Sequence, residues 1–312
     1  MAINFNNAYV QQFKAMLLDV MQQSQPLVRS QLLADASRTG VSAVLDMWDR
    51  VGNVLLQPIG VHTNTVELNP NHSRRGALMQ SRGGGILISK NVDLVRALLN
   101  PQSDYLRLLG KAGVQTIDKE VLDQAIGSAT TVTTARATGQ QTYGTQAMLS
   151  AYQIGGATAV DLSRVIATGV LLSKASVPTG AKNRVWFYSP GQETDFMAIT
   201  QASSGDFTKN KIHDAGGMDG VDWQGFHFVQ IPDVVDETTT ALVRMLQLPS
   251  ATERYNIAMY RGGVGLSIGQ EITPEISPRA DKNNETQVYI SLSIGAVRLW
   301  EGAVVRVSCL EN

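Results

Sequence analysis

Apolar residues recur at helical spacing near the start of the chain, over residues 7–24. The other face of this segment carries glutamines, and Pro26 ends or kinks the pattern. The apolar positions are Val10, Phe13, Leu17 and Val20. The pattern predicts an amphipathic helix, either a core element or an arm that docks on a neighbouring molecule.

The pattern changes to partial alternation of apolar and polar residues between Val41 and Trp48, and alternation returns between Val61 and Leu68. Alternation with a period of two is typical of strands. The segment from Gly52 to Gly85 is rich in glycine, proline and asparagine, which favour turns and loops. We expect a long protruding β-hairpin here, because an irregular stretch of this length is unusual inside a globule.

A second helical pattern starts at Asn100-Pro101 and ends at Gly127. Asparagine suits an N-cap, proline the first helical position, and glycine the residue after the last turn. A helix of about 26 residues would extend about 39 Å. Helices of this length often form the central support of a mixed α+β protein.

The second half of the chain alternates between shorter helices and strands. The threonine- and glycine-rich segment 130–144 is expected to be a domain boundary or surface crossover. Thr158 and Asp161 resemble a capping box ahead of a helix. The remaining elements are a buried strand at 184–188, a helix opened by Ser189-Pro190, strands at 226–231 and 242–248, and two strands within 287–308 around Glu301-Gly302.

Composition limits the classes of function. The 312 residues include 26 Lys and Arg against 27 Asp and Glu, a formal net charge of −1. A dedicated nucleic-acid binder usually has a basic excess, so we expect any DNA contact to be weak and non-specific. The single cysteine, Cys309, excludes an intrachain disulfide. We expect neither a membrane span nor a secretory signal, and hence synthesis and folding in a cytoplasm.

One segment matches a catalytic motif. Gly265 to Gly269 has the G-x-S-x-G spacing of serine hydrolases, with Ser267 as the candidate nucleophile. That motif needs a helix directly after the serine, but Pro274 and Pro278 follow. All four histidines precede Ser267, whereas the hydrolase histidine comes later in the chain. A glycine-rich strand is the favoured interpretation, and no catalytic residue is assigned.

Other chemistry is weakly indicated. The histidines at 62, 72, 213 and 227 and the aspartates between 206 and 222 lack the spacing of zinc or calcium sites. No metal and no cofactor is therefore expected. The most basic spot is His72-Ser73-Arg74-Arg75, in the expected hairpin. Because arginine forks suit carboxylates, we favour contact with a neighbouring subunit over a solvated tip.

The order of these elements resembles that of the major capsid proteins of tailed bacteriophages, with the Hong Kong 97 type (HK97-like) fold. The likeness covers nearly the whole chain and rests on the order of individually weak motifs. These are Val10-Gln11-Gln12-Phe13; Arg74-Arg75; Pro101, Ser103 and Tyr105; Asp118 or Asp123; Ser189-Pro190-Gly191-Gln192; Ser204 to Phe207; Gln224-Gly225-Phe226; Ile294 to Arg298; and Val304 to Cys309.

The resemblance implies an α+β, HK97-like capsid fold with five parts. These are an N-terminal arm at 1–40, an extended β-hairpin loop with flanking strands at 41–90, a peripheral domain with the spine helix at 91–144, an axial domain at 145–280, and strands returning to the peripheral domain at 281–312. Candidate inter-subunit contacts are Phe13, His72, Arg74 and Arg75. Some members cross-link through a lysine on the extended loop, but residues 48–85 contain none, so no cross-link is expected.

The implied function is a subunit that assembles with itself into pentamers and hexamers of an icosahedral phage head around double-stranded DNA. Implied partners are a portal protein, a separate scaffolding protein because the N-terminus is short, and decoration proteins. The implied location is the virion, after assembly in the host cytoplasm. An encapsulin-like shell, a tail or baseplate protein, and a serine hydrolase using Ser267 remain alternatives.

Overall fold

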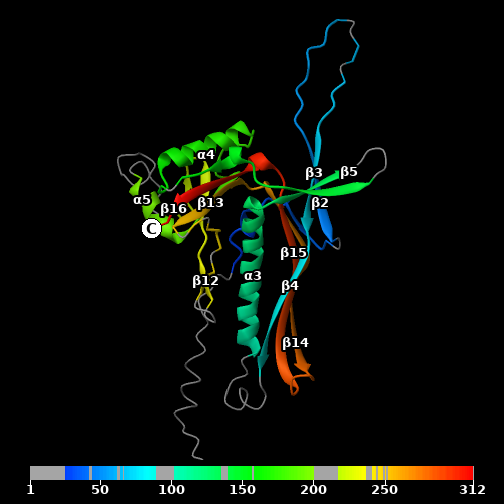
Figure 1. Ribbon diagram of the computed structural model, residues 1–312, viewed down its shortest axis with the longest axis vertical. Helices are drawn as coiled ribbons and strands as arrows, with labels where there is room; N and C mark the ends of the chain where they lie inside the picture. The colour runs from blue at the N-terminus through cyan, green and yellow to red at the C-terminus, as the bar shows by residue number, and fades with distance from the viewer. Residues whose placement is uncertain are drawn as a thin grey trace, which may run out of the picture.

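The computed structural model describes residues 25–41, 44–61, 64–65, 67–88, 102–134, 140–156, 158–199, 217–236, 241–243, 245–248, 250 and 252–311. The fold is mixed, with few helices and several sheets. A globular part lies beside one end of a long helix, a long sheet runs along that helix, and a thin hairpin projects beyond both (Figure 1).

The globular part is built on a six-stranded sheet of order β7-β16-β13-β8-β10-β9. Trp186 in its central strand is fully buried, and its ring centroid lies 5.4 Å from that of Phe226 and 5.7 Å from that of Phe228. Packing of this kind makes the strand the centre of a core. The strands are β7 (Gln153–Ile154), β8 (Arg184–Tyr188), β9 (Asp222–Trp223), β10 (Phe226–Gln230), β13 (Glu253–Tyr260) and β16 (Val304–Leu310).

Short helices and a small ribbon complete this part. Helix α4 (Leu162–Lys174) covers the sheet, and Val165 and Leu172 contribute its buried face. The other elements are α5 (Glu193–Ala198), the 3-10 turns η2 (Ser150–Tyr152), η3 (Pro190–Gln192) and η4 (Glu301–Ala303), and the two-stranded β11 (Val234–Asp236) and β12 (Ala241–Val243).

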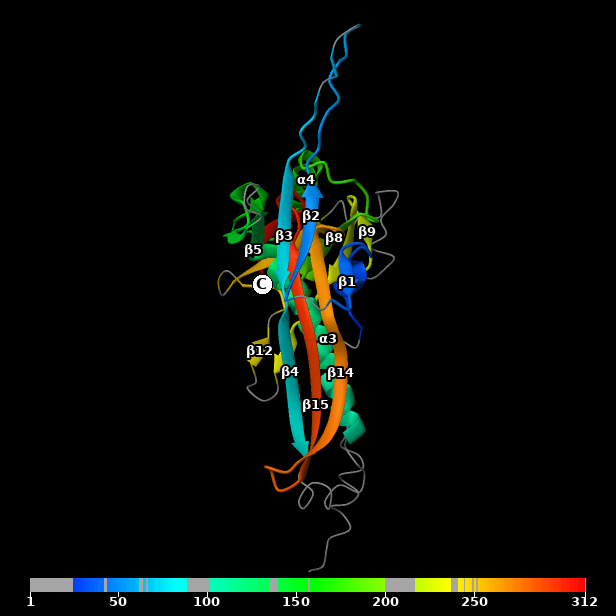
Figure 2. The same cartoon turned by 90° about the vertical axis from the view of Figure 1, so that its right-hand side faces the viewer.

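Helix α3 (Gln102–Ile126) runs along the long sheet of order β1-β14-β15-β4 (Figure 2). Val121 and Leu122 of the helix share one core cluster with Ile294 of the sheet, and all three are almost completely buried. Helix α3 therefore supports the long sheet, as expected for a helix of this length. The sheet contains β1 (Ser37–Thr39), β4 (Gln80–Ile88), β14 (Val264–Arg279) and β15 (Glu285–Arg298), and the turn η1 (Arg29–Gln31) precedes β1.

Strand β14 tolerates two prolines because its neighbour β1 ends before them. Strand β1 pairs only with residues 266–268, so the far part of β14 pairs with β15 alone. Beyond that point β14 is an edge strand, where proline costs no ladder hydrogen bond on the open side. Pro274 and Pro278 lie in this part. The favoured strand interpretation of residues 265–269 is confirmed.

The hairpin arises from a third sheet of order β2-β3-β5-β6. Strand β2 (Leu45–Val51) pairs antiparallel with β3 (His72–Leu78), from Leu45 opposite Leu78 to Val51 opposite His72. Strands β5 (Ala129–Thr134) and β6 (Gln141–Gln146) extend the sheet after α3.

Several local expectations are confirmed: the long helix, the buried strand at 184–188, the turn of helix after Ser189, the strand from Phe226, and the two terminal strands. Others are wrong. The returning arm of the hairpin forms a strand only from His72 onward. The residues within 61–68 that the structure describes are not in the expected strand. Residues 130–144 contribute to a β-hairpin instead of a plain crossover, because β5 finds a partner in β3.

Glycine-rich chain was also misassigned. Gly83, Gly84 and Gly85 lie in β4, not in a loop, and a Cβ at Gly83 would collide with the hydroxyl of Tyr289 in the paired strand. Glycine is used here for close approach rather than for a turn. The strand expected at 242–248 is shorter, and the chain bends at the buried Met245 and Leu246.

Strands from the two segments expected at 145–280 and 281–312 pair with one another. Strand β14 runs with β15 in the long sheet beside α3. Strand β16 pairs with β13 in the globular part. The expected arm helix at 7–24, with Phe13, and the motif at 204–207 lie outside the described residues.

Asp161 is the N-cap of α4, so the expected capping box with Thr158 is wrong. Its Oδ1 accepts from the backbone N of Arg164 at 2.9 Å. Replacing Asp161 with alanine is expected to reduce the free energy of unfolding by about 1 kcal/mol, because a terminal N–H loses its acceptor. Urea denaturation measures this. Asp161→Asn, which keeps an acceptor oxygen, should lose much less, and equal losses in both variants would contradict the cap.

Candidate functional site: the hairpin base and its buried ion pairs

Ser267 lacks the geometry of a nucleophile. It lies in the continuous strand β14, opposite Gly295 of β15, and no helix follows it. Its side chain is fully buried and its Oγ has no hydrogen-bond partner. A hydrolytic serine needs an exposed Oγ beside a base. The position is part of the core.

Within the described part of the chain, no group of three or more His, Cys, Asp or Glu side chains could hold a metal ion. No helix there is long and apolar enough to cross a membrane.

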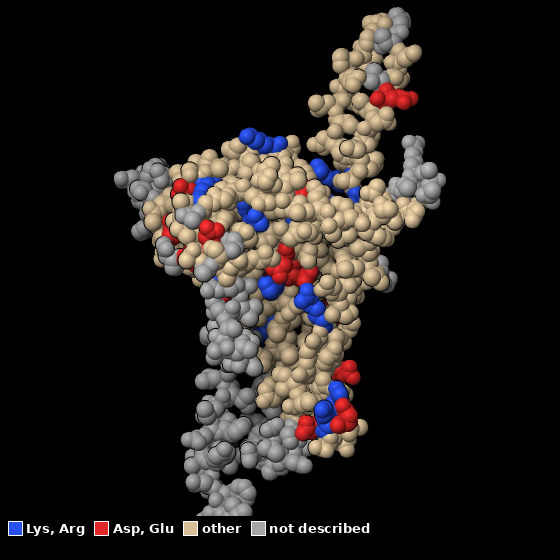
Figure 3. Space-filling model, viewed as in Figure 1, with Lys and Arg blue, Asp and Glu red and all other residues tan. Residues whose placement is uncertain are grey.

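In the distal hairpin (residues 52–71), the residues that the structure describes include several exposed apolar side chains. Figure 3 shows this projection to be almost free of charged side chains. Leu55, Leu56 and Val61 are 87%, 89% and 86% exposed. Large exposed apolar side chains gathered on one projection mark an interaction surface, because water solvates them poorly.

Arg74 and Arg75 point to opposite faces of β3, as neighbours in a strand must. Arg74 is on the solvated face, where its Nη2 donates to Oδ2 of the paired residue Asp49 at 2.7 Å. The hydrogen bond from Arg74 lowers the pKa of the Asp49 carboxyl. His72, which begins the strand, is exposed. The ion pair between Arg74 and Asp49 thus joins the two arms of the hairpin at its base.

Arg75 is buried on the other face. Its Nη2 donates to Oε1 of Glu301 at 2.9 Å and to Oε1 of Gln146 at 2.8 Å. The residue is 7% exposed, as is Glu301. A buried ion pair therefore connects the hairpin to the turn that precedes the last strand.

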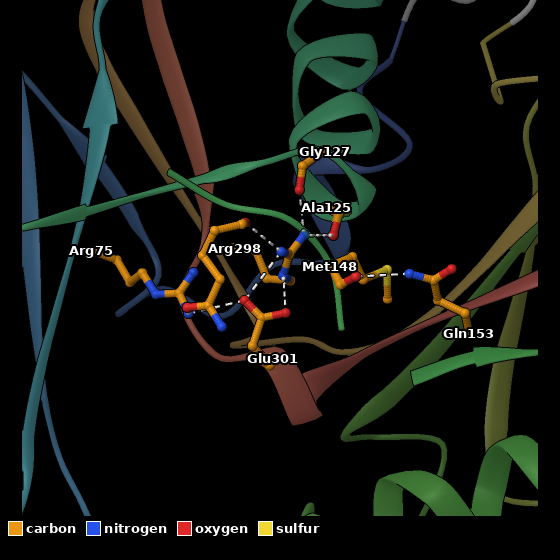
Figure 4. A network of polar contacts seen from close by, with 8 residues as sticks. Arg75, Ala125, Gly127, Met148, Gln153, Arg298 and Glu301 are labelled. Atoms are coloured by element: carbon orange, nitrogen blue, oxygen red, sulfur yellow. Dashed lines mark hydrogen bonds and ion pairs between the residues drawn. The ribbon is translucent and has the colours of Figure 1, made fainter. Parts of the chain in front are cut away.

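Glu301 also binds a second arginine, Arg298 at the end of β15 (Figure 4). Nε of Arg298 lies 3.1 Å from Oε2 of Glu301, and Nη2 lies 3.1 Å from Oε1. Nη1 donates to the carbonyl oxygens of Ala125 and Gly127, at 2.9 and 2.7 Å. The cation thereby satisfies carbonyls at the C-terminal end of α3. Burial lowers the pKa of the Arg298 guanidinium, and the hydrogen bond to Glu301 opposes this.

We call Arg75, Arg298 and Glu301 the arginine–glutamate junction. It connects the hairpin sheet, the long helix, the long sheet and the start of β16. One carboxylate serves two buried guanidinium groups, so the junction carries a local excess of one positive charge.

Comparison with known proteins identifies the molecule that carries this hairpin. The family model described as "Phage capsid protein" matches residues 5–311. The chain belongs to this family. The expected relationship to tailed-phage major capsid proteins is confirmed. No curated protein matches the chain by sequence.

Solved phage structures share the fold of this capsid protein. A capsid structure of Ralstonia phage GP4 matches with a TM-score of 0.67 and 12% identity, over 95% of this chain and 93% of that chain. The head structure of Helicobacter pylori bacteriophage KHP40 gives 0.64 and 9%, over 100% and 99%. A structure from Mycobacterium phage Che8 gives 0.63 and 14%, over 94% of both chains.

A cavity of about 460 Å³ lies at the base of the hairpin of the capsid protein, between β3 and the β5–β6 hairpin. Its lining combines cationic side chains, hydroxyls and an amide: His72, Ser73, Arg74, Arg75, Thr131, Thr133 and Gln146, with Asp49 and Val132. Three of the four predicted contact residues, all except Phe13, therefore meet at one place.

Sequence reasoning missed Arg298 and Glu301 as partners of Arg75. The available signal was weak: Arg298 follows the mostly apolar run of β15, and Glu301 follows three residues later. A charge at the end of a buried strand needs a partner. Nothing local indicates that the partner comes from residue 75.

Proposed function

We propose that this capsid protein is the major shell subunit of an icosahedral phage head, forming rings of five and six copies around double-stranded DNA. The family match supports a capsid role, and the exposed apolar hairpin is the observation that carries the assembly proposal. A heterologous contact closes into rings when its rotation allows, and a thin hairpin can bend to serve two ring sizes.

We assign roles to the parts on this basis. The six-stranded sheet with α4 and α5 is the axial region around the ring centre, and α3 with the long sheet is the peripheral region. The distal hairpin is the extended loop that lies over a neighbour. Two arms of about ten residues each extend roughly 30 Å at the rise of a strand, enough to cross onto the next subunit. These are the parts of an HK97-like subunit.

The proposed partners are further copies of this chain, a portal protein, a separate scaffolding protein and decoration proteins. Contact with packaged DNA would be weak and non-specific because the chain has a net charge of −1. The proposed location is the virion, after assembly in the host cytoplasm. The family match favours this role over an encapsulin-like compartment.

The test is to produce the full chain with and without the candidate scaffolding protein and to image the products by negative-stain electron microscopy. Closed shells, or separate five- and six-membered rings, are the expected result. Only monomers in the presence of the scaffolding protein would overturn the proposal.

A further inference from the structure

We propose that Glu67 on the hairpin of one copy binds in the cavity at the base of the hairpin of a second copy, where it meets Arg75. The inference rests on the proposed function, because it names the contact through which neighbouring subunits join. Its occupant is a carboxylate of this same chain.

The cavity has a cationic group with spare donor capacity. Arg75 is 7% exposed and lines the cavity, and its Nη1 has no hydrogen-bond partner. An unpaired buried donor costs free energy, and a donor on a charged group costs more. Glu301, the carboxylate that faces Arg75, is shared with Arg298. An added carboxylate would supply the missing acceptor and offset the local positive excess.

The rest of the lining suits the same ligand. Arg74 also lines the cavity, but its guanidinium is already bound to Asp49, so Arg75 supplies the charge for the ligand. Ser73, Thr131 and Thr133 contribute hydroxyls that can donate to carboxylate oxygens. Hydrogen bonds from ionised donors to a carboxylate are roughly twice as strong as neutral ones, and a recessed site screens them less.

The hairpin offers one matching group. Between Arg50 and Arg74 the sequence contains a single charged residue, Glu67, apart from histidines. Glu67 is exposed and makes no hydrogen bond or ion pair with the part of the chain that the structure describes. A single carboxylate on a largely uncharged projection fits a receiving cavity that presents a buried guanidinium with an unused donor.

The extended arm keeps Glu67 away from the cavity of its own copy. Glu67 and Ser73 lie six residues apart in the same arm, about 20 Å at the rise of an extended chain. Glu67 therefore cannot fold back into its own cavity while the arm stays extended (Figure 1). A projection and a receptor at different places on one surface make a heterologous contact, which repeats around a ring.

Cysteine cross-linking tests the contact directly. The variant Glu67→Cys/Ser73→Cys is co-assembled with equal amounts of the unmodified chain, so that native contacts maintain the shell, and then oxidised. A covalent dimer on a non-reducing gel is expected, because Ser73 is exposed at the cavity and Cys309 is buried. The control Glu67→Cys/Ser163→Cys, with an exposed serine on α4, should give none.

Assembly yield gives a second readout. Glu67→Gln should raise the subunit concentration needed for shells by about tenfold, as loss of one charged contact of about 1.4 kcal/mol would. Glu275→Gln, the same change at an exposed site in β14, should not. Shells that incorporate the double-cysteine chain but show no dimer would overturn this inference and leave the shell function standing. Failure of the unmodified chain to form shells in the presence of the scaffolding protein would instead refute the proposed function.

Discussion

Replacing residues 53–70 with a two-residue turn is expected to abolish shell formation and leave a folded subunit. The change removes Leu55, Leu56, Val61 and Glu67, which are exposed and belong to no core cluster. It keeps the β2–β3 ladder and the hydrogen bond from the N of Gly52 to the O of Asn71, so a two-residue hairpin turn can close the strands.

Two measurements separate assembly from folding. Sedimentation velocity and electron microscopy should show no shells under conditions where the unmodified chain forms them. Urea denaturation of the unassembled subunit should give a free energy of unfolding within about 0.5 kcal/mol of the original, as for other surface changes. Shells of normal size from the shortened chain would show that the hairpin does not carry assembly.

Replacing Glu301 with alanine is expected to destabilise the subunit by about 3–5 kcal/mol, the cost typical of removing one partner from a buried ion pair. The change leaves the guanidinium groups of Arg75 and Arg298 buried without their shared carboxylate. Arg298 is fully buried and also binds the carbonyls at the end of α3, so it cannot move to solvent without breaking those bonds.

Urea denaturation of the unassembled subunit, followed by circular dichroism, measures the loss. Glu275→Ala is the matched control, because this exposed carboxylate makes no described ion pair, and it should change stability by less than about 0.5 kcal/mol. A loss below about 1 kcal/mol for Glu301→Ala, the range of exposed pairs, would mean that water solvates the junction.

The junction ties the base of the hairpin to the rest of the subunit. Arg75 in β3 binds Glu301, and Glu301 binds Arg298, which also donates to the carbonyls at the end of α3. The thin distal part is therefore mounted on a rigid base. We expect this base to orient the projection toward the neighbouring subunit, while the distal residues adapt to it.

Elements controlled by neighbours in sequence could be predicted from the chain alone. The helix at 102–126 follows from its spacing and end signals, and the helix at 162–174 from the spacing of its apolar residues, although its cap was assigned to the wrong residue. The buried strand at 184–188 is a continuous apolar and aromatic run that begins with Arg184. Helical periods and caps act within four residues, so they remain readable without the fold.

The basic spot at His72 to Arg75 was also recognisable as a candidate contact, because two adjacent arginines with no local acid need carboxylates from elsewhere. The sequence by itself could not show that Arg74 and Arg75 bind different carboxylates. Strand geometry sends Arg74 toward Asp49 and solvent, and Arg75 inward to Glu301, which is 226 residues away.

Family membership, the long helix, the expectation of a long hairpin and the cap at Ser189 were thus determined by the sequence itself. Tertiary structure alone decided that the glycines 83–85 form a strand, that β16 joins the globular sheet, and that Arg75, Arg298 and Glu301 meet. The physical reason is range: strand pairing and charge burial depend on contacts between distant segments, and no local pattern specifies which segments meet.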